Sequence, residues 1–380
     1  MRMLDGIIVI ELGSFITGPL SGLVLAEMGA DVIKVERPEG DPFRQFDGGK
    51  YSPHFQAHNR NKRSVVIDYV KEEHRPALTA LLARADVLLF NMRPGVMEKL
   101  GYSMQGLRAQ FPKLVICAIS GFGQTGPYAQ RPAFDNVGQA LSGWMSRFKV
   151  SSDPRVVGPA VSDAATGLYA ASAILGALLE RERTGVARTI DISMLESTLA
   201  FGLEPIGQYL ATGVVPPVFQ RAAMSQAYSV TCADGRRIGL HLSSPDKFWD
   251  ALCRAIERPD LVERYPKRMD RIRHYERLAE TLNAVFATRP RDAWLEKLAD
   301  SDVPFAPEHE LNELSSDSQV AHLAPFYTIN HPQMGPIASL HRPYRVDGSR
   351  EIRFRPPPVL GEHTLEVLAE FGITAVPVEL

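Results

Sequence analysis

The sequence contains only three cysteines, Cys117, Cys232 and Cys253, and no two of them lie close together. Without a CxxC pair, neither a disulfide framework nor a zinc site is indicated, and a reducing compartment fits. The N-terminus leads directly into a short apolar strand, without the apolar segment and small-residue cleavage site of a secretory signal. We therefore expect a cytoplasmic protein.

Long apolar runs and an excess of one charge are also missing. No apolar run reaches the roughly 20 residues needed to span a bilayer. The formal net charge of -2 creates no long-range field that would attract nucleic acid or an anionic membrane. The 380 residues are 45% hydrophobic and 23% charged, which suits a globular protein of one large domain with an insertion, or of two domains.

Several common catalytic motifs are absent. The chain has no GxSxG and no GxxxxGK[ST], so neither a hydrolase elbow nor a P-loop is supported. The turn at 13–19 is not GxGxxG, although a turn between a strand and a helix can bind phosphate or be a plain turn. Glu36-Arg37 keeps an NAD(P) enzyme open, because an acid there would hold a ribose. A surface ion pair is the alternative interpretation of these two residues.

The first half of the chain alternates between apolar runs of strand length and helical patterns. This alternation is typical of an α/β protein with a parallel sheet, helices on both faces, and ligands bound at the carboxyl ends of the strands. The predicted strands are 7–12, 31–36, 64–68, 87–91, 114–120 and 189–193, and the predicted helices are 19–28, 72–83, 103–110, 166–183 and a long helix ending near 211.

The pattern changes after a Pro- and Gly-rich stretch at 213–225, which predicts a linker. The strands 228–231 and 236–242 flank Asp234-Gly235, a dipeptide that favours a tight hairpin turn. Amphipathic helices follow, so this part of the chain predicts a small α+β domain. These helices are 247–255, 277–287 and 291–298, and a closing helix is predicted at 364–371.

Two polar clusters precede the strand at 64–68. The basic run 59–63 would suit the phosphates of coenzyme A, although a solvated face is the usual explanation for such a run. His54 and His58 have the spacing of metal ligands on a helix, but Pro53 and the polar context predict a loop. We expect no metal site.

The segment 158–167 places Asp163 at the start of an apolar helix rich in small residues. Aspartate is a preferred helix N-cap, and spacing alone favours that role. The carboxylate would also suit a nucleophile, because its small neighbours leave room for a thioester.

Together these motifs resemble the class III CoA-transferase family, which includes formyl-CoA transferase, carnitine CoA-transferase and α-methylacyl-CoA racemase. The resemblance covers nearly the whole chain. Its motifs are Leu4-Asp5-Gly6, Gly18-Pro19, 29–38, 59–64, Arg93-Pro94-Gly95, 121–127, 163–167 and 357–364.

The resemblance implies a fold and an assembly. It implies a large Rossmann-like, CoA-binding domain built from both chain ends, 1–212 and 326–380, and a smaller inserted α+β domain at 226–325. The segment 213–225 would link them. It also implies an interlocked homodimer.

The resemblance further implies roles for individual residues. Asp163 matches the catalytic aspartate that attacks an acyl-CoA and carries the acyl group and then CoA. Lys99 replaces an arginine that binds the CoA phosphates, and Val70 replaces a CoA-contacting lysine. The remaining CoA-binding positions are Phe15, Ile16 and Thr17 in the CoA site, Arg37 at the adenosine phosphate, and Asn91 and Met92 beside the pantetheine arm.

Position 134 separates the two activities of the family. The racemases carry a histidine there as a base, and phenylalanine cannot accept a proton, so racemisation is disfavoured. The glycine-rich lid of the formyl-type transferases is also absent, which disfavours oxalate as the acceptor. We therefore expect transfer of CoA from an acyl-CoA, with succinyl-CoA suggested by analogy, to a free carboxylic acid. No permanently bound cofactor is expected. A 2-methylacyl-CoA racemase, an NAD(P) oxidoreductase and a non-catalytic CoA-binding protein remain the alternatives.

Overall fold

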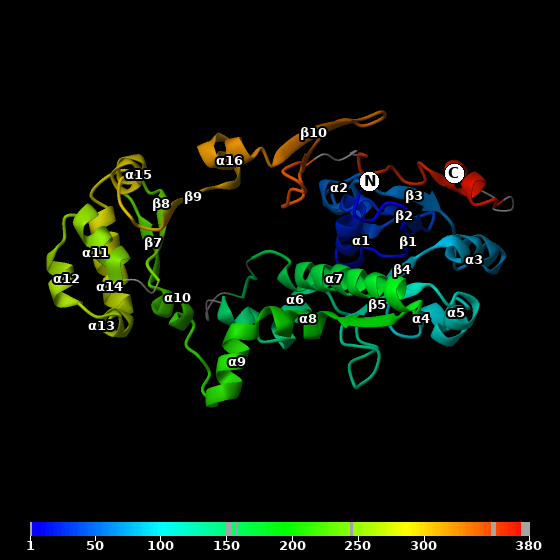
Figure 1. The fold of residues 1–380 in the computed structure, drawn as a ribbon, viewed down its shortest axis with the longest axis horizontal. Helices are drawn as coiled ribbons and strands as arrows, with labels where there is room; N and C mark the ends of the chain where they lie inside the picture. The colour runs from blue at the N-terminus through cyan, green and yellow to red at the C-terminus, as the bar shows by residue number, and fades with distance from the viewer. Residues whose placement is uncertain (1, 149–153, 157, 244–245, 351–354, 374–380) are drawn as a thin grey trace. The chain divides into compact units, whose positions relative to one another are not determined.

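The computed structural model describes residues 2–148, 154–156, 158–243, 246–350 and 355–373 (Figure 1). The chain divides into two compact units. Unit 1 comprises Met1–Gly207 and Pro325–Leu380, and unit 2 comprises Gln208–Ala324. Each unit has a hydrophobic core of its own.

Unit 1 is built around a six-stranded sheet in which every pair of neighbouring strands is parallel. The strand order β3-β2-β1-β4-β5-β6 confirms the predicted parallel α/β architecture. The order reverses between β1 and β4, where the carboxyl ends of the strands leave a crevice in folds of this type. The strands are β1 (Ile8–Glu11), β2 (Asp31–Glu36), β3 (Arg63–Val66), β4 (Val87–Phe90), β5 (Val115–Ser120) and β6 (Thr189–Ser193).

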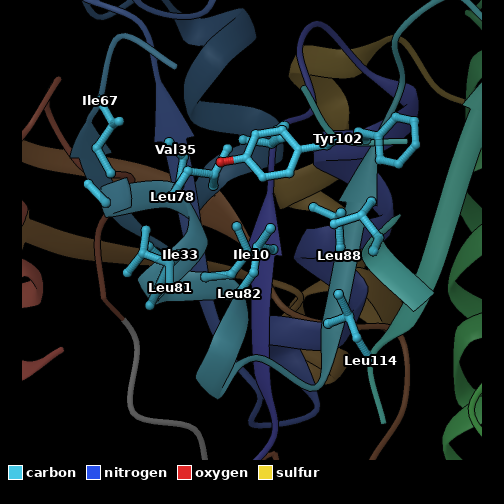
Figure 2. Close-up of a cluster of buried hydrophobic side chains, with 14 of the residues drawn as sticks. Ile10, Ile33, Val35, Ile67, Leu78, Leu81, Leu82, Leu88, Tyr102 and Leu114 are labelled. Atoms are coloured by element: carbon cyan, nitrogen blue, oxygen red, sulfur yellow. The ribbon is translucent and has the colours of Figure 1, made fainter. Parts of the chain in front are cut away.

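Alternate residues of the strands supply the two faces of this sheet. On one face, residues such as Val9 pack against α1 (Thr17–Glu27) and α7 (Val161–Thr184). On the other face, Ile10 packs against α3 (Arg75–Arg84), and Leu88 belongs to the same core cluster, as Figure 2 shows. Helices α4 (Val96–Lys99), α5 (Met104–Gln110) and α17 (Thr364–Glu370) also belong to unit 1. Both faces are therefore covered, which explains the continuous apolar runs of the strands.

Helix α7 is longer than the sequence predicted, because it begins at Val161 and not at residue 166. It ends at Gly185, which has a φ of 74° and accepts the left-handed conformation without the penalty of a Cβ. By length and composition alone this helix could cross a membrane, although the sequence predicted no membrane-spanning segment. Half of its apolar window is buried within the protein, where it packs against α1 and β5.

Several elements of unit 1 differ from the prediction. The long helix after β6 is two helices, α8 (Met194–Phe201) and α9 (Leu203–Thr212), on either side of Gly202. Residues 53–59, predicted as a loop, form a helix that Ser52 caps with its hydroxyl. The elements that the sequence did not indicate are α2 (Pro53–Asn59), α4 (Val96–Lys99), α6 (Asp135–Leu141), the antiparallel hairpin β10 (Phe326–His331) and β11 (Gly335–Leu340), and the 3-10 turns Pro42–Gln45 and Met145–Arg147. The first residues of the helix predicted at 72–83 form a 3-10 turn, Glu72–His74, before α3 begins.

Unit 2 contains the predicted hairpin. β7 (Ala227–Thr231) and β8 (Arg237–His241) are antiparallel, and Gly235 in their turn has a φ of 78°. A third strand, β9 (Phe305–Glu308), pairs with β8 and was not predicted. The helices are α10 (Gln220–Ser225), α11 (Asp246–Ala255), α12 (Asp260–Arg264), α13 (Arg268–Arg273), α14 (Tyr275–Phe286), α15 (Arg291–Ala299) and α16 (Ser318–Leu323), with a 3-10 turn at Leu311–Ser316.

Candidate active site

A cavity of about 220 Å³ lies at the carboxyl ends of β1, β4, β5 and β6, at the crevice expected from the strand order. It is smaller than the roughly 300–1,000 Å³ of pockets that hold drug-sized ligands, so it suits the reacting end of a larger molecule. The lining residues that the argument uses are Phe15, Ile16, Thr17, Asn91, Met92, Arg93, Arg131, Phe134 and Asp163. Six of the eight predicted site residues are therefore brought together at one place.

Among the described residues that line this cavity, Asp163 is the only carboxylate. It is half-buried, and no donor among the described residues forms a hydrogen bond with its side-chain oxygens. Burial, followed by the charge of Asp135, raises the pKa of Asp163 from its ordinary value of 3.8 to about 7. An unpaired carboxylate with a raised pKa, facing a cavity, is typical of a functional group and not of a structural one.

The N-cap interpretation of Asp163 is wrong. Helix α7 has Ala160 at its N-cap position, and Asp163 is its third residue. The cap is supplied instead by Asp135 at the start of α6, whose Oδ1 accepts from the backbone N–H groups of Ser162 at 2.8 Å and Asp163 at 3.2 Å. The side chain of Asp163 is thus free for chemistry.

Asp135 is a site residue whose role the sequence did not reveal. Its Oδ2 accepts from Nε2 of Gln139 at 2.6 Å, and the same amide group donates to the carbonyl of Pro159 at 3.2 Å. Asp135 therefore fixes the start of α7 and raises the pKa of Asp163. The signal available in the sequence was its place next to Phe134, the position that separates the two activities of the family.

The turn after β1 is held in shape by Asn91. Its Nδ2 donates to the carbonyl of Ser14 at 2.7 Å and to Oγ1 of Thr17 at 2.8 Å, and its Oδ1 accepts from the Ser14 N–H at 3.0 Å. Gly13 and Gly18 approach so closely that a Cβ on Gly13 would lie 3.0 Å from the Gly18 Cα. Asn91 thus shapes the wall of the cavity with its whole amide group.

Phe15 is the strained residue of this turn, with a φ of 61°. Its N–H donates to Oδ1 of Asp41 at 3.1 Å, and its ring packs edge-on against Phe43 and Phe134, with centroid distances of 5.3 Å and 5.5 Å. Such a conformation costs about 1–3 kcal/mol and persists only where the surroundings enforce it. The buried carboxylate and the two rings supply that enforcement.

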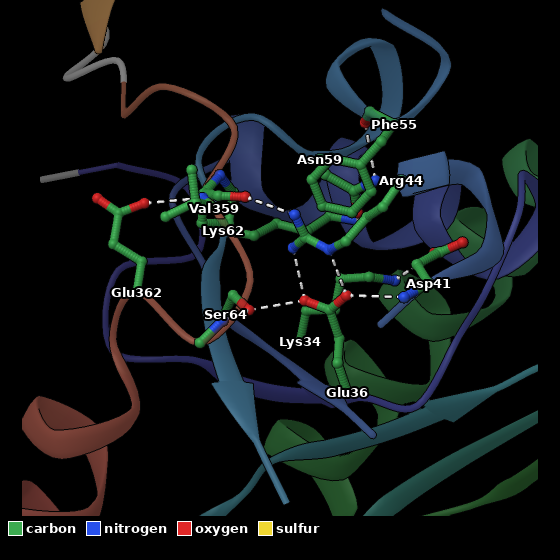
Figure 3. A network of polar contacts seen from close by, with 12 residues as sticks. Lys34, Glu36, Asp41, Arg44, Phe55, Asn59, Lys62, Ser64, Val359 and Glu362 are labelled. Carbon is green, nitrogen blue, oxygen red and sulfur yellow. Dashed lines mark hydrogen bonds and ion pairs between the residues drawn. The ribbon is translucent and has the colours of Figure 1, made fainter. Parts of the chain in front are cut away.

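A buried ionic network contacts the backbone of this turn (Figure 3). Nζ of Lys34 lies 2.9 Å from Asp41 and 3.2 Å from Glu11, and it donates to the Gly13 carbonyl at 2.6 Å. Lys62 donates to the carbonyl of Pro19 at 2.8 Å and lies 2.9 Å from Glu11. The network therefore ties the turn and the first residues of α1 to the sheet.

Glu36 is part of the same buried region and does not hold a ribose. Both of its oxygens accept from the Arg44 guanidinium at 2.7 Å, and Ser64 and the Asp41 N–H also donate to it. Neither predicted role of Glu36-Arg37 applies. Glu36 is not available to hold a ribose, and it does not form a surface ion pair with Arg37, because it pairs with the buried Arg44. With its acceptors occupied, Glu36 gives no support to an NAD(P) site.

The basic run 59–63 is neither a solvated face nor a phosphate site. Lys62 is fully buried, and Arg60 and Arg63 expose only 8% and 3% of their surface. Nε of Arg60 donates to Glu27 at 2.9 Å, and Nε of Arg63 donates to Asp31 at 3.0 Å. These cations hold the sheet and its helices together.

Arg37 and Lys99 do not line the Asp163 cavity. Arg37 is exposed beyond β2 and pairs with Glu39 at 3.3 Å and Asp68 at 3.7 Å, while Lys99 is exposed in the last turn of α4. Val70, in place of a lysine, is half exposed. These positions could serve only a part of a ligand that extends outside this cavity.

His54 and His58 do lie on one helix, α2, contrary to the predicted loop. Nδ1 of His58 lies 3.1 Å from the carbonyl of His54, and Nε2 of His54 lies 3.7 Å from Asp47. Within the described residues, no group of three or more His, Cys, Asp or Glu side chains could hold a metal ion.

The sequence matches a known family along almost its whole length. Residues 4–364 match the model described as CoA-transferase family III. The succinyl-CoA:glutarate CoA-transferase of Mus musculus is 30% identical, over 97% of this chain and 86% of that protein. The succinyl-CoA:mesaconate CoA-transferase of Haloarcula hispanica is 33% identical, over 98% and 97%. The acetyl-CoA:oxalate CoA-transferase of Acetobacter aceti is 34% identical, over 83% of each.

Solved structures show the same fold. A CAIB/BAIF family protein from Brucella suis superposes with a TM-score of 0.84 at 31% identity, over 98% of this chain and 100% of that one. The orthorhombic form of Rv3272 from Mycobacterium tuberculosis gives a TM-score of 0.84 at 30% identity, over 96% and 98%.

Proposed function

Because this chain belongs to CoA-transferase family III, we propose that its Asp163 is the nucleophile that moves CoA from an acyl-CoA donor to a free carboxylic acid. The chain is a CoA-transferase, and its relatives of that name span nearly all of it. The observation that carries the proposal is the unpaired carboxylate of Asp163 in a small cavity at the carboxyl ends of the strands.

The proposed reaction has two symmetrical halves. The Asp163 carboxylate attacks the thioester carbonyl of the donor, the C–S bond breaks, and an acyl-aspartyl anhydride and CoA thiolate form. The thiolate attacks the aspartyl carbonyl, which releases the donor acid and leaves an aspartyl-CoA thioester. The acceptor carboxylate attacks the carbonyl of this thioester, the C–S bond breaks, and a second anhydride and CoA thiolate form. The thiolate then attacks the acceptor carbonyl, which releases the new acyl-CoA and the free Asp163 carboxylate. Each step exchanges one acyl bond for another, as covalent catalysis requires.

The surroundings of Asp163 suit these intermediates. An anhydride and a thioester must be kept from water, and the cavity around Asp163 is small and partly lined by apolar side chains. Phe134 is exposed at its wall and packs edge-on against Phe15. A phenyl ring cannot accept the α-proton of an acyl-CoA, which favours transfer over racemisation.

The names of the relatives suggest the substrates. Two of the relatives described above use succinyl-CoA, with glutarate or mesaconate as the acid. We propose succinyl-CoA as the donor and a small dicarboxylic acid as the acceptor. Coenzyme A enters as part of a substrate and leaves as part of a product, so no permanently bound cofactor is required.

We also propose an interlocked homodimer in the cytoplasm, as the family implies. In unit 1, large apolar side chains of α7 to α9 are exposed, among them Leu168 (51%), Leu179 (60%), Phe201 (52%) and Leu203 (71%). Exposed apolar residues of this size on neighbouring helices favour a covered interface. All three cysteines are free and buried, which suits a reducing compartment. The mass in solution, measured by light scattering, tests the dimer.

Chemical trapping tests the proposed nucleophile. We expect hydroxylamine or borohydride, added during turnover with succinyl-CoA, to leave a modification at Asp163 that peptide mass spectrometry detects. Asp163→Ala should abolish both the modification and the transfer. An unmodified Asp163, together with full transfer by Asp163→Ala, would refute the proposal. Exchange of the α-proton of 2-methylacyl-CoA in heavy water would instead identify a racemase.

A further inference from the structure

We infer that Arg131 is the specificity-determining residue that binds the distal carboxylate of a dicarboxylic substrate, both in the free acid and in its CoA thioester. This inference rests on the proposed function, since it concerns the acyl chain that Asp163 would carry. It is based on the charges that line the cavity and on the way in which Arg131 is held.

The charges of the cavity are unbalanced. Its lining contains two guanidinium groups, Arg93 and Arg131, and one carboxylate, Asp163. Within the described residues, no carboxylate forms an ion pair with either arginine. By contrast, the arginines that secure the sheet and its helices are paired, such as Arg44 with Glu36. The cavity therefore offers positive charge for a ligand that brings its own anion.

The two arginines differ in the cavities that they line. Arg93 also lines a second cavity, of about 660 Å³, between the ends of β4, β5 and α5. Arg131 is not among the residues that line this second cavity, and it does line the cavity that contains Asp163. A ligand group that Arg131 binds within this cavity therefore shares the cavity with the reacting carboxylate.

Stacking orients Arg131. Its guanidinium lies 3.7 Å from the centroid of the Tyr128 ring, and the Tyr128 ring packs edge-on against Phe122 with a centroid distance of 5.8 Å. The backbone N–H of Arg131 donates to the backbone carbonyl of Tyr128 at 2.9 Å, and this hydrogen bond closes the turn that carries both residues. A guanidinium stacked on a ring keeps its N–H groups available in one plane, the geometry that binds a carboxylate through two hydrogen bonds.

The chemistry of transfer requires such a cation only for diacids. A monocarboxylate loses its charge when it becomes an anhydride or a thioester, so its chain is then neutral. A dicarboxylate keeps one charge at its distal end throughout, and burying that charge without a partner is costly. Because donor and acceptor chains are both attached in turn to Asp163, one arginine can serve both half-reactions.

The experiment compares matched diacids and monoacids. The full-length enzyme is assayed by chromatography of its CoA products, with succinyl-CoA against butyryl-CoA as donors and glutarate against pentanoate as acceptors. Each pair has the same chain length and differs in the distal carboxylate. The variants are Arg131→Gln and Arg131→Lys. The control is Arg183→Gln at the opposite end of α7, about 30 Å along the helix from Asp163.

We expect the wild-type enzyme to prefer the diacid in each pair, and Arg131→Gln to lower the diacid-to-monoacid ratio of kcat/KM by about 10- to 100-fold, as for the loss of a charged hydrogen bond. Arg131→Lys should give a ratio between those of the wild type and Arg131→Gln. Lysine keeps the positive charge but cannot form two parallel hydrogen bonds with a carboxylate. Arg183→Gln should keep the wild-type ratio.

The other outcomes separate the two proposals. If Arg131→Gln raises the KM of succinyl-CoA and butyryl-CoA equally, Arg131 binds the CoA moiety and the inference is wrong. Equal use of diacids and monoacids by the wild-type enzyme also overturns it, while leaving CoA transfer intact. Absence of transfer to any acid, with any donor, would instead overturn the proposed function.

Discussion

Replacing Asp163 by asparagine should abolish transfer and, at the same time, stabilise the protein at high pH. Asparagine has nearly the same shape but does not ionise. In the folded protein the pKa of Asp163 is raised from 3.8 to about 7, first by burial and then by Asp135. The unfolded chain therefore loses this proton at a lower pH than the folded chain, so ionisation favours unfolding.

The size of the effect follows from this shift. Below pH 3.8 both states hold the proton, and Asp163 has no effect on stability. Between pH 3.8 and pH 7, ionisation of Asp163 lowers the free energy of unfolding by about 1.4 kcal/mol for each pH unit. Asp163→Asn should therefore raise the free energy of unfolding by about 2 kcal/mol at pH 5 and by about 4 kcal/mol at pH 8.

Denaturant titrations at several pH values between 5 and 8, followed by tryptophan fluorescence and circular dichroism, measure this difference. The control is Asp300→Asn, which makes the same change at an exposed residue after α15. A gain in stability that is equal at pH 5 and pH 8, or no gain at all, would show that the Asp163 carboxylate is not desolvated as its surroundings imply.

Three further results are expected. Asp135→Asn removes the charge that helps to raise the pKa of Asp163, so the rising limb of the pH–rate profile, near pH 7 in the wild type, should move to lower pH; a limb that stays in place would contradict this. Lys34→Met leaves the buried carboxylate of Asp41 without Lys34, while Glu11 keeps Lys62, and should lower the free energy of unfolding by about 3–5 kcal/mol, measured by denaturant titration; Lys247→Met, at an exposed pair, should cost less than about 1 kcal/mol. Cys117 is buried and its pKa is raised to about 12, so a thiol reagent such as DTNB should leave it unmodified in the native protein and modify it after unfolding, as peptide mapping would show.

Local patterns in the sequence determined most elements of unit 1. The strands at 31–36 and 189–193 agree with the structure to the residue, because β-branched runs between turn residues leave little choice of conformation. Helix α7 ends at Thr184 and is capped by Gly185, within one residue of the predicted end at 183, for a similarly local reason. Helix α2 was missed even though Ser52-Pro53 is a good helix start, because its polar residues outweighed that signal.

Charge pairing depended on the tertiary structure. The basic run at 59–63 resembles a solvated face, since the acids that neutralise it lie elsewhere in the sequence. The structure brings Glu27 to Arg60, Asp31 to Arg63 and Glu11 to Lys62, and all three cations become buried. Sequence proximity carries no information about partners on other elements of the sheet.

The sequence alone determined that the chain is an α/β protein resembling the CoA-transferases, and that Asp163 stands at the start of a helix. Only the tertiary structure decided what that carboxylate is free to do. Asp135, 28 positions earlier, caps the helix through the N–H groups of Ser162 and Asp163. No donor among the described residues then binds the side chain of Asp163, which lies in a cavity that it shares with Arg131. This division of roles between two carboxylates depends on distances across the fold, which no local pattern encodes.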